Sequence, residues 1–193
     1  GLIVDIGYWV IHEACQMAAR LKNQGYKVPV AINLSPKQFD DPNLVQRIGA
    51  ELQLAGIPAD RLECEITEST FISNAEVFSN NIRAVRDIGV TLAIDDFGTG
   101  YSSLSYLKRL PVSVLKIDRS FITDIAQSED DRALVRSMIA IAESLSLSIV
   151  VEGIEDKEQL AVVTQLGCEV IQGFYFSRGL PESALFEWLK APA

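Results

Sequence analysis

The sequence predicts an α/β fold in which helices cover a parallel β-sheet that curves into a β/α barrel. Segments with apolar residues at helical spacing alternate along the chain with short runs rich in β-branched residues. These runs are almost continuously apolar, which is typical of parallel strands buried on both faces. With 193 residues, 48% of them hydrophobic, the chain is long enough for one well-packed domain.

The elements follow one another in a regular order. The first expected helix runs from Leu2 to Leu21, Gly25 follows its end, and the strand VPVAIN comes next. Further helices are expected near residues 43–55, 76–88, 131–145, 157–166 and 182–189. Further strands are LECEIT, VTLAIDD, VSVLKID, SIVVEG and EVIQG. No linker or low-complexity tract divides the chain.

Each expected strand ends on a polar side chain. These residues are Asn33, Glu65, Asp95 with Asp96, Lys116, Glu152 and Gln172. They are roughly 20 to 36 residues apart, as in successive βα units, and the strands of a parallel barrel end at one mouth. A single polar residue at a strand end also serves as a helix cap or turn former. Six in register favour a ring of functional groups.

The ring has the ligand chemistry of a hard divalent cation. The only histidine, His12, lies in the first helix and no cysteine ends a strand, so zinc and haem are not expected. Oxygen-only groups suit Mg²⁺ or Mn²⁺, and such cations would offset the repulsion between crowded carboxylates. The oxygen donors are Asn33, Glu65, Asp95, Asp96 and Glu152.

Two adjacent aspartates predict a break in their strand. Asp95 and Asp96 would face opposite sides of a regular strand, so both reach one site only if the strand breaks there, as Gly98 and Gly100 allow. One aspartate could then bridge two ions while the other binds the second. Two metal ions a few ångströms apart fit an in-line attack on a phosphodiester.

Lys116 has three possible roles. It could hold the nucleophilic water or the charge that develops on the phosphate, or it could form a structural ion pair with the aspartates. A Schiff-base lysine of an aldolase barrel is the rival chemistry. The carboxylates argue against that rival because they keep the ammonium protonated.

Composition excludes some partners and locations. The chain has 17 Lys and Arg against 26 Asp and Glu, so it offers no basic surface for a nucleic-acid polymer. Its three cysteines show no Cys-x-x-Cys spacing, which fits a reducing compartment, and we expect a cytoplasmic location. No apolar run reaches the roughly 18 residues of a membrane span, so we expect no membrane contact.

Several motifs resemble one family. "INLSPKQF", "LECEITEST", "AIDDFGTGYSSLSYLKRLPVSVLKIDRSFI", "IVVEGIE" and "GCEVIQGFYFSRGL" are similar to those of the EAL domain family of cyclic di-GMP phosphodiesterases. The resemblance runs along the whole chain and implies a modified (β/α)₈ TIM-type barrel. It implies metal-dependent hydrolysis of cyclic di-GMP to linear pGpG, with two Mg²⁺ or Mn²⁺ ions.

The resemblance assigns roles to named residues. It implies that Asn33, Glu65, Asp95, Asp96 and Glu152 are metal ligands and that Lys116 holds the catalytic water. Glu155 and Gln172 are implied as supporting residues of the catalytic site, together with Lys116 and Glu152. The expected neighbours of the cyclic di-GMP ligand are Ser35, Gln38, Asp118 and Arg178.

Glu68 resembles the anchor of the loop Phe97 to Leu104, which links metal binding to dimer contacts in the family. The loop residues in question are Phe97, Gly98, Thr99 and Gly100. An N-capping role for Glu68 ahead of the next helix is an equally good explanation.

The chain departs from the family pattern in two places. Gly179 stands where the family usually has proline, which weakens the assignment of Arg178. The chain also opens at Gly1 within a helical pattern, and six strands do not close an eight-stranded barrel. We therefore expect residues 1–193 to form the C-terminal three quarters of an EAL domain, without the first strands and the Glu-Ala-Leu motif.

Three functions remain open. The first is a two-metal cyclic di-GMP phosphodiesterase, the second a module that binds cyclic di-GMP without cleaving it, and the third a phosphoesterase for another dinucleotide. Partners expected from the resemblance are cyclic di-GMP, a second copy in a homodimer, and sensory or GGDEF domains upstream. These 193 residues alone are expected to be impaired in metal binding and hydrolysis.

Overall fold

The structure, a computed structural model, describes residues 2–68, 70, 76–100 and 107–190. Within these ranges one six-stranded sheet has the order β1-β2-β3-β4-β5-β6, and all neighbouring strands are parallel. The strands are β1 (Val30–Asn33), β2 (Leu62–Thr67), β3 (Thr91–Phe97), β4 (Val114–Ile117), β5 (Ser148–Val151) and β6 (Val170–Ile171).

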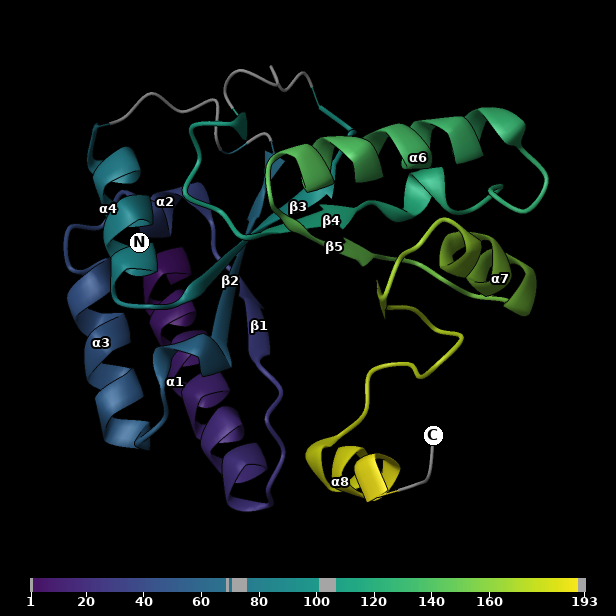
Figure 1. Cartoon of the computed structure of the whole chain (residues 1–193). Helices are drawn as coiled ribbons and strands as arrows, with labels where there is room; N and C mark the ends of the chain where they lie inside the picture. The colour runs from purple at the N-terminus through teal and green to yellow at the C-terminus, as the bar shows by residue number, and fades with distance from the viewer. Residues whose placement is uncertain (1, 69, 71–75, 101–106, 191–193) are drawn as a thin grey trace.

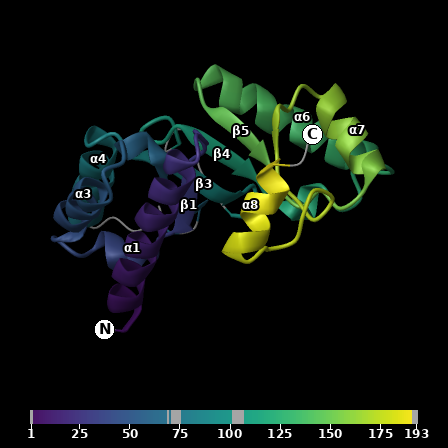
Figure 2. The same ribbon diagram turned by 90° about the horizontal axis from the view of Figure 1, so that it is seen from below.

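Helices pack on the outer side of the curved sheet, with α1, α3 and α4 towards one end and α6 and α7 towards the other (Figures 1 and 2). The helices are α1 (Leu2–Asn23), α2 (Pro36–Phe39), α3 (Leu44–Ala55), α4 (Glu76–Asp87), α6 (Glu129–Ser144), α7 (Lys157–Gln165) and α8 (Glu182–Lys190), with 3₁₀ turns η1 (Ala59–Arg61) and η3 (Arg119–Phe121). None of these helices is both long and apolar enough to cross a lipid bilayer.

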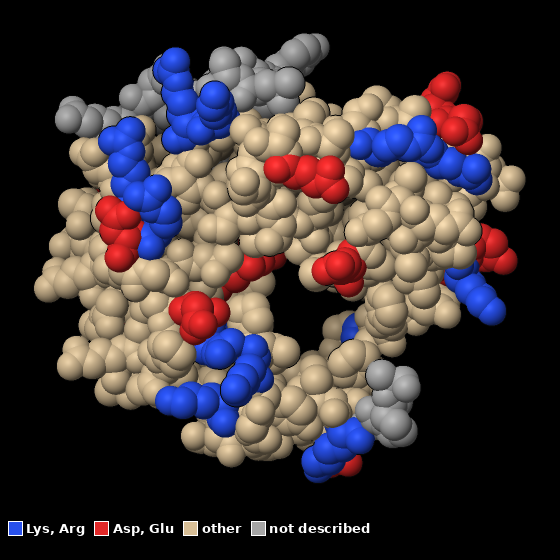
Figure 3. Space-filling view, viewed as in Figure 1, with Lys and Arg blue, Asp and Glu red and all other residues tan. Residues whose placement is uncertain are grey.

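The predicted fold class is confirmed, because the sheet forms a parallel α/β half-barrel. Strands β1 and β6 stand at the two ends of the strand order. Figure 3 shows an opening through the middle of the molecule, with acidic side chains at its rim. Helix α6 begins at Glu129, slightly earlier than predicted, because the Ser128 hydroxyl caps it by accepting the Asp131 N–H at 3.1 Å.

The alternation of side chains in β2 determines what faces the inside of the half-barrel. Leu62, Cys64 and Ile66 are fully buried and share one face of the strand. Glu63 and Glu65 therefore share the opposite face. In β1 the same alternation sets Asn33 opposite the buried Ile32. Glu152 and Gln172 lie directly beyond the ends of β5 and β6.

Candidate active site

A buried cluster of charges joins the carboxyl ends of four neighbouring strands. The ammonium of Lys116 in β4 lies 2.5 Å from Glu65 Oε1, 2.7 Å from Glu152 Oε1 and 3.4 Å from Asp95 Oδ1. Only 3% of Lys116 is exposed. The parallel pairing of β2, β3, β4 and β5 brings these residues together although they are far apart in the chain. We name this group the Lys116 cluster.

The cluster keeps Lys116 charged. Burial alone would lower the pKa of Lys116, but its hydrogen bonds to Glu152 and Glu65 outweigh burial and raise the pKa above its usual value. Burial raises the pKa of Glu152, against the opposing effect of Lys116. Because the ammonium stays protonated, Lys116 is suited to donate hydrogen bonds and not to attack a carbonyl, which argues against the Schiff-base alternative.

A β-bulge interrupts β3 at the paired aspartates. The pairing of β3 with β4 shifts between Ile94 and Phe97, and Asp96 adopts a left-handed conformation with φ of 56°. Asp95 Oδ1 accepts the N–H of Asp96 at 3.1 Å. The break in the strand is therefore present, but Asp96 itself supplies the unusual conformation, and Gly98, with φ of 97°, only follows it.

Two neighbouring cavities open beside the Lys116 cluster. The smaller, of about 290 Å³, is lined by five of the predicted residues: Asp96, Asp118, Glu152, Glu155 and Gln172. The larger, of about 680 Å³, is lined by four of them: Glu65, Lys116, Gln172 and Arg178. Gln172 lines both cavities, and we name the two together the recess, which is lined by more acidic than basic side chains.

Electrostatics in the recess favour a cation. Burial raises the pKa of Asp96, and the nearby carboxylates of Asp95 and Asp118 raise it further. Hydrogen bonds to Ser120 and Arg119 lower the pKa of Asp118, although burial opposes them. Several carboxylates thus share a confined volume, and a divalent cation would relieve their repulsion.

Three predicted residues at the β1 end lie apart from the cavities. Asn33 is exposed, although its backbone pairs with Glu65. Ser35 donates its hydroxyl and its N–H to Oε1 of Gln38, at 2.8 and 3.0 Å. Gln38 is buried, and its amide occupies the space that a side chain at Gly7 of α1 would need. In this arrangement Ser35 and Gln38 support helix packing.

Glu68 binds the loop that follows β3. Its Oε2 accepts the N–H of Gly98 at 2.8 Å, and its Oε1 would lie 3.0 Å from a Cβ placed on Gly100. The Thr99 hydroxyl donates to Asp96 O at 2.8 Å, while Phe97 is buried. These are the contacts that a loop anchor would make, and residues 69 and 71–75, ahead of α4, lie outside the described residues, so both roles of Glu68 stay predictions. Residues 101–106, the rest of that loop, lie outside the described residues.

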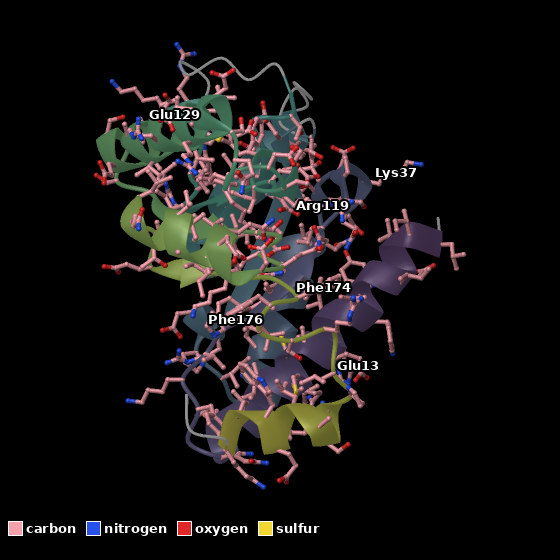
Figure 4. All side chains as sticks on the ribbon, turned by 90° about the vertical axis from the view of Figure 1, so that its right-hand side faces the viewer. Glu13, Lys37, Arg119, Glu129, Phe174 and Phe176 are labelled. Atoms are coloured by element: carbon pink, nitrogen blue, oxygen red, sulfur yellow. The ribbon has the colours of Figure 1, made fainter. Side chains whose placement is uncertain are left out.

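Sequence reasoning missed several groups at the recess. Arg119 and Phe174 line the smaller cavity, and Figure 4 places Arg119 above Phe174. The guanidinium of Arg178 stacks on the Phe174 ring at 4.5 Å from its centroid. Glu63 lines the larger cavity, and burial, followed by Glu65, raises its pKa. The period-two alternation of LECEIT was the signal that could have identified Glu63.

The oxygen donors have the chemistry that a hard divalent cation needs. In this structure, however, they are not arranged around a common cation site. Carboxylates of Glu65, Asp95 and Glu152 converge on one point. That point is the ammonium of Lys116, and among the described residues no three His, Cys, Asp or Glu side chains are grouped as a metal site. Side-chain rotation at the recess would be needed before a cation is held.

The fold and the recess together define a class of protein, the α/β barrels that carry acidic residues and a lysine at the carboxyl ends of their strands. Comparison with known families narrows this class. Residues 1–179 match the EAL domain, and the chain belongs to the EAL domain family.

Similar proteins are known in sequence and in structure. The chain is 42% identical to cyclic di-GMP phosphodiesterase NbdA of Pseudomonas aeruginosa over 99% of the chain and 24% of NbdA. It is 44% identical to the bifunctional diguanylate cyclase/cyclic di-GMP phosphodiesterase MucR of the same organism, over 96% of the chain and 27% of MucR. The chain thus spans about a quarter of the length of these relatives.

Solved structures agree with this placement. The PaMucR phosphodiesterase in complex with c-di-GMP superposes with a TM-score of 0.90 and 42% identity, over 96% of this chain and 75% of that one. Klebsiella pneumoniae BlrP1, in a complex with manganese and cyclic di-GMP, superposes with a TM-score of 0.79 and 34% identity, over 89% of this chain and 44% of that one.

Proposed function

We propose that this chain contributes the catalytic residues of a cyclic di-GMP phosphodiesterase, which hydrolyses cyclic di-GMP to linear pGpG. The observation that carries the proposal is the Lys116 cluster, which brings three carboxylates and one ammonium to the carboxyl ends of neighbouring strands. Membership of the EAL domain family and the names of NbdA and MucR support this substrate.

Two divalent cations, Mg²⁺ or Mn²⁺, are part of the proposal. The residues that would hold them are Asn33, Glu65, Asp95, Asp96 and Glu152. The manganese complex of BlrP1 supports a cation of this kind. When bound, such ions activate water and neutralise charge on a phosphodiester. The β3 bulge serves this role because it lets two consecutive carboxylates approach one recess.

The chain's own groups position the reactants. Lys116, held protonated, donates a hydrogen bond to the attacking water or to a phosphate oxygen. Glu155 and Gln172 line the smaller cavity, and Gln172 also reaches the larger one beside Lys116, so these two side chains orient that water. Asp118 and Arg178 lie at the two cavities, where they are suited to contact the nucleotide. Ser35 and Gln38 would first have to break the hydrogen bonds between them before either could contact the nucleotide.

Partners and location also belong to the proposal. A homodimer would use the loop that Glu68 anchors, and sensory or GGDEF domains upstream would regulate the recess. MucR, which is both a diguanylate cyclase and a cyclic di-GMP phosphodiesterase, supports such an arrangement. Since cyclic di-GMP is a nucleotide second messenger, we place the domain in the cytoplasm.

A second function is favoured by one specific observation. Three of the four carboxylates that would hold metal, those of Glu65, Asp95 and Glu152, are bound to Lys116, and among the described residues no group of acidic side chains forms a metal site. A domain that keeps this arrangement would bind cyclic di-GMP without cleaving it and transmit the signal to a partner.

Product analysis separates the two functions. The full-length protein is incubated with cyclic di-GMP and Mg²⁺ or Mn²⁺, and the nucleotides are separated by liquid chromatography and identified by mass spectrometry. Metal-dependent formation of pGpG, abolished by a chelator, is the expected result. Saturable binding of cyclic di-GMP with no pGpG would contradict the enzyme and establish the binding module.

A further inference from the structure

Gln159 joins two loops at the recess. This residue lies in the first turn of α7 and is 6% exposed. Its Oε1 accepts the N–H of Glu155 at 2.7 Å and that of Asp156 at 3.3 Å. Its Nε2 donates to the carbonyl oxygen of Thr123 at 3.2 Å, across 36 residues of sequence. One amide thus connects the loop after β5 with the segment after β4.

Helix capping explains only part of this arrangement. In a capping box the third helical residue accepts a hydrogen bond from the N-cap N–H, and glutamate does this as well as glutamine. Here that contact, from Asp156, is the longer of the two, and the shorter comes from Glu155. The bond to Thr123 requires a donor, which an ionised glutamate lacks. The amide nitrogen is therefore the feature that the capping role leaves unexplained.

Both connected loops carry residues of the recess. The loop after β5 contains Glu152 and Glu155, and the segment after β4 begins with Asp118 and Arg119. Thr123 is tied back to this segment, because its N–H and its hydroxyl both donate to Arg119 O at 3.0 Å. Gly153 packs so closely on Arg119 that an added Cβ would lie 2.3 Å from its side chain. The two loops already meet at the Glu152 N–H, which donates to Ile117 O at 3.1 Å, and at Gly153. Gln159 adds the side-chain connection between Glu155 and Thr123, farther from the strand ends.

We propose that Gln159 is a positioning residue for the phosphodiester hydrolysis, holding Glu155 against the Asp118 side of the recess. This inference rests on the proposed function. Gln159 has no contact with the recess itself, and it acts through the Glu155 backbone and the Thr123 carbonyl.

Amide hydrogen exchange tests the connection without reference to activity. Gln159→Met keeps the length of the side chain and removes all three hydrogen bonds. We expect the Glu155 amide to exchange at least tenfold faster in this variant, and the neighbouring amides of 153–156 and 119–123 to follow. The control is Ser128→Ala, which removes the cap of α6 and should leave these segments unchanged. Unchanged exchange in Gln159→Met would overturn the proposal.

Kinetics test the consequence. We expect Gln159→Met to lower kcat for cyclic di-GMP at least tenfold and to change KM less than threefold, while Ser128→Ala lowers only thermal stability. Gln159→Glu should also lower kcat, because an ionised carboxylate cannot donate a hydrogen bond to the Thr123 carbonyl oxygen.

The outcomes are distinguishable. A parent-like kcat in Gln159→Met would overturn the positioning role even if exchange accelerates. If the parent protein itself forms no pGpG, the proposed function fails, and the exchange result alone decides whether Gln159 holds the two loops.

Discussion

Two clusters of polar groups stabilise different parts of this domain, and their charges differ. In the Lys116 cluster, three carboxylates share one ammonium, so negative charge is in excess. The other cluster lies among the outer helices: the Tyr8 hydroxyl donates to Asp41 at 2.7 Å, and Arg47 stacks on the Tyr8 ring at 4.1 Å from its centroid. Here one carboxylate meets one guanidinium and no charge is in excess.

The difference separates structure from function. Asn81 donates to the carbonyl oxygens of Phe39 and Asp41, so the outer cluster satisfies its own groups and joins helices. The inner cluster leaves negative charge uncompensated in a recess, which costs folding free energy and is typical of a site built for a cationic or reacting partner. Removing a carboxylate from the inner cluster should therefore lower turnover and spare stability. Removing one from the outer cluster should lower stability and spare turnover.

The largest effect is expected for Asp95→Asn. Removing this charge should lower turnover of cyclic di-GMP by several orders of magnitude, because the recess loses a group proposed to hold metal. The metal-free protein should be as stable as the parent or more so, since repulsion falls. Activity is measured as pGpG formation and stability by urea unfolding with a chelator present.

Asp41→Asn is the matched control in the outer cluster. It should lower stability through the weakened hydrogen bond with Tyr8 and leave turnover within about twofold. Near-normal turnover in Asp95→Asn, or the same pattern in both variants, would contradict the distinction between the clusters.

Lys116→Met should affect both stability and activity. Removing one partner of a buried ion pair costs about 3–5 kcal/mol, and here three carboxylates lose their common partner. We expect a large fall in urea midpoint and loss of pGpG formation at temperatures where the protein stays folded. Unchanged stability would show that the carboxylates find another counter-ion, and that the cluster is not held together by Lys116.

The two clusters also differ in how far the sequence could predict them. Lys116, Glu65, Asp95 and Glu152 follow from one rule, because parallel strands end at one edge and each strand ends on a polar residue. The outer cluster joins Tyr8 of α1 to Asp41, which lies between α2 and α3, and no repeating pattern in the sequence brings these two residues together.

Two features of the site could not be predicted from the sequence: the irregular backbone of β3, and the choice of hydrogen-bond partners by some of its side chains. The need for a strand break at Asp95 and Asp96 was predictable, but not that Asp96 would itself take the left-handed conformation. The motif INLSPKQF indicated Ser35 and Gln38 as ligand contacts, whereas a capping interaction occupies both in the structure. Whether they turn to a ligand stays a prediction.

A smaller effect is expected for Glu68→Ala. The Gly98 N–H loses its acceptor, so the loop after β3 should loosen and turnover should fall about tenfold, while the Lys116 cluster stays intact. Glu129→Ala, which removes an exposed ion pair with Arg132, serves as the control. Unchanged turnover together with unchanged amide exchange at Gly98 would contradict the anchoring role.

The smallest effect is expected for Tyr8→Phe, which tests the outer cluster by pH. The hydrogen bond from Tyr8 lowers the pKa of Asp41, and burial raises the pKa of Tyr8 to about 12. A carboxyl with a depressed pKa adds stability above its unfolded value of about 4, and that contribution is lost as the pH falls through the folded value. Tyr8→Phe should therefore cost about 1 kcal/mol at pH 6 and progressively less towards pH 3, with turnover at pH 7 unchanged. Urea unfolding across this range measures the difference, and a cost that stays constant with pH would show that the phenol stabilises the helices by packing and not through Asp41.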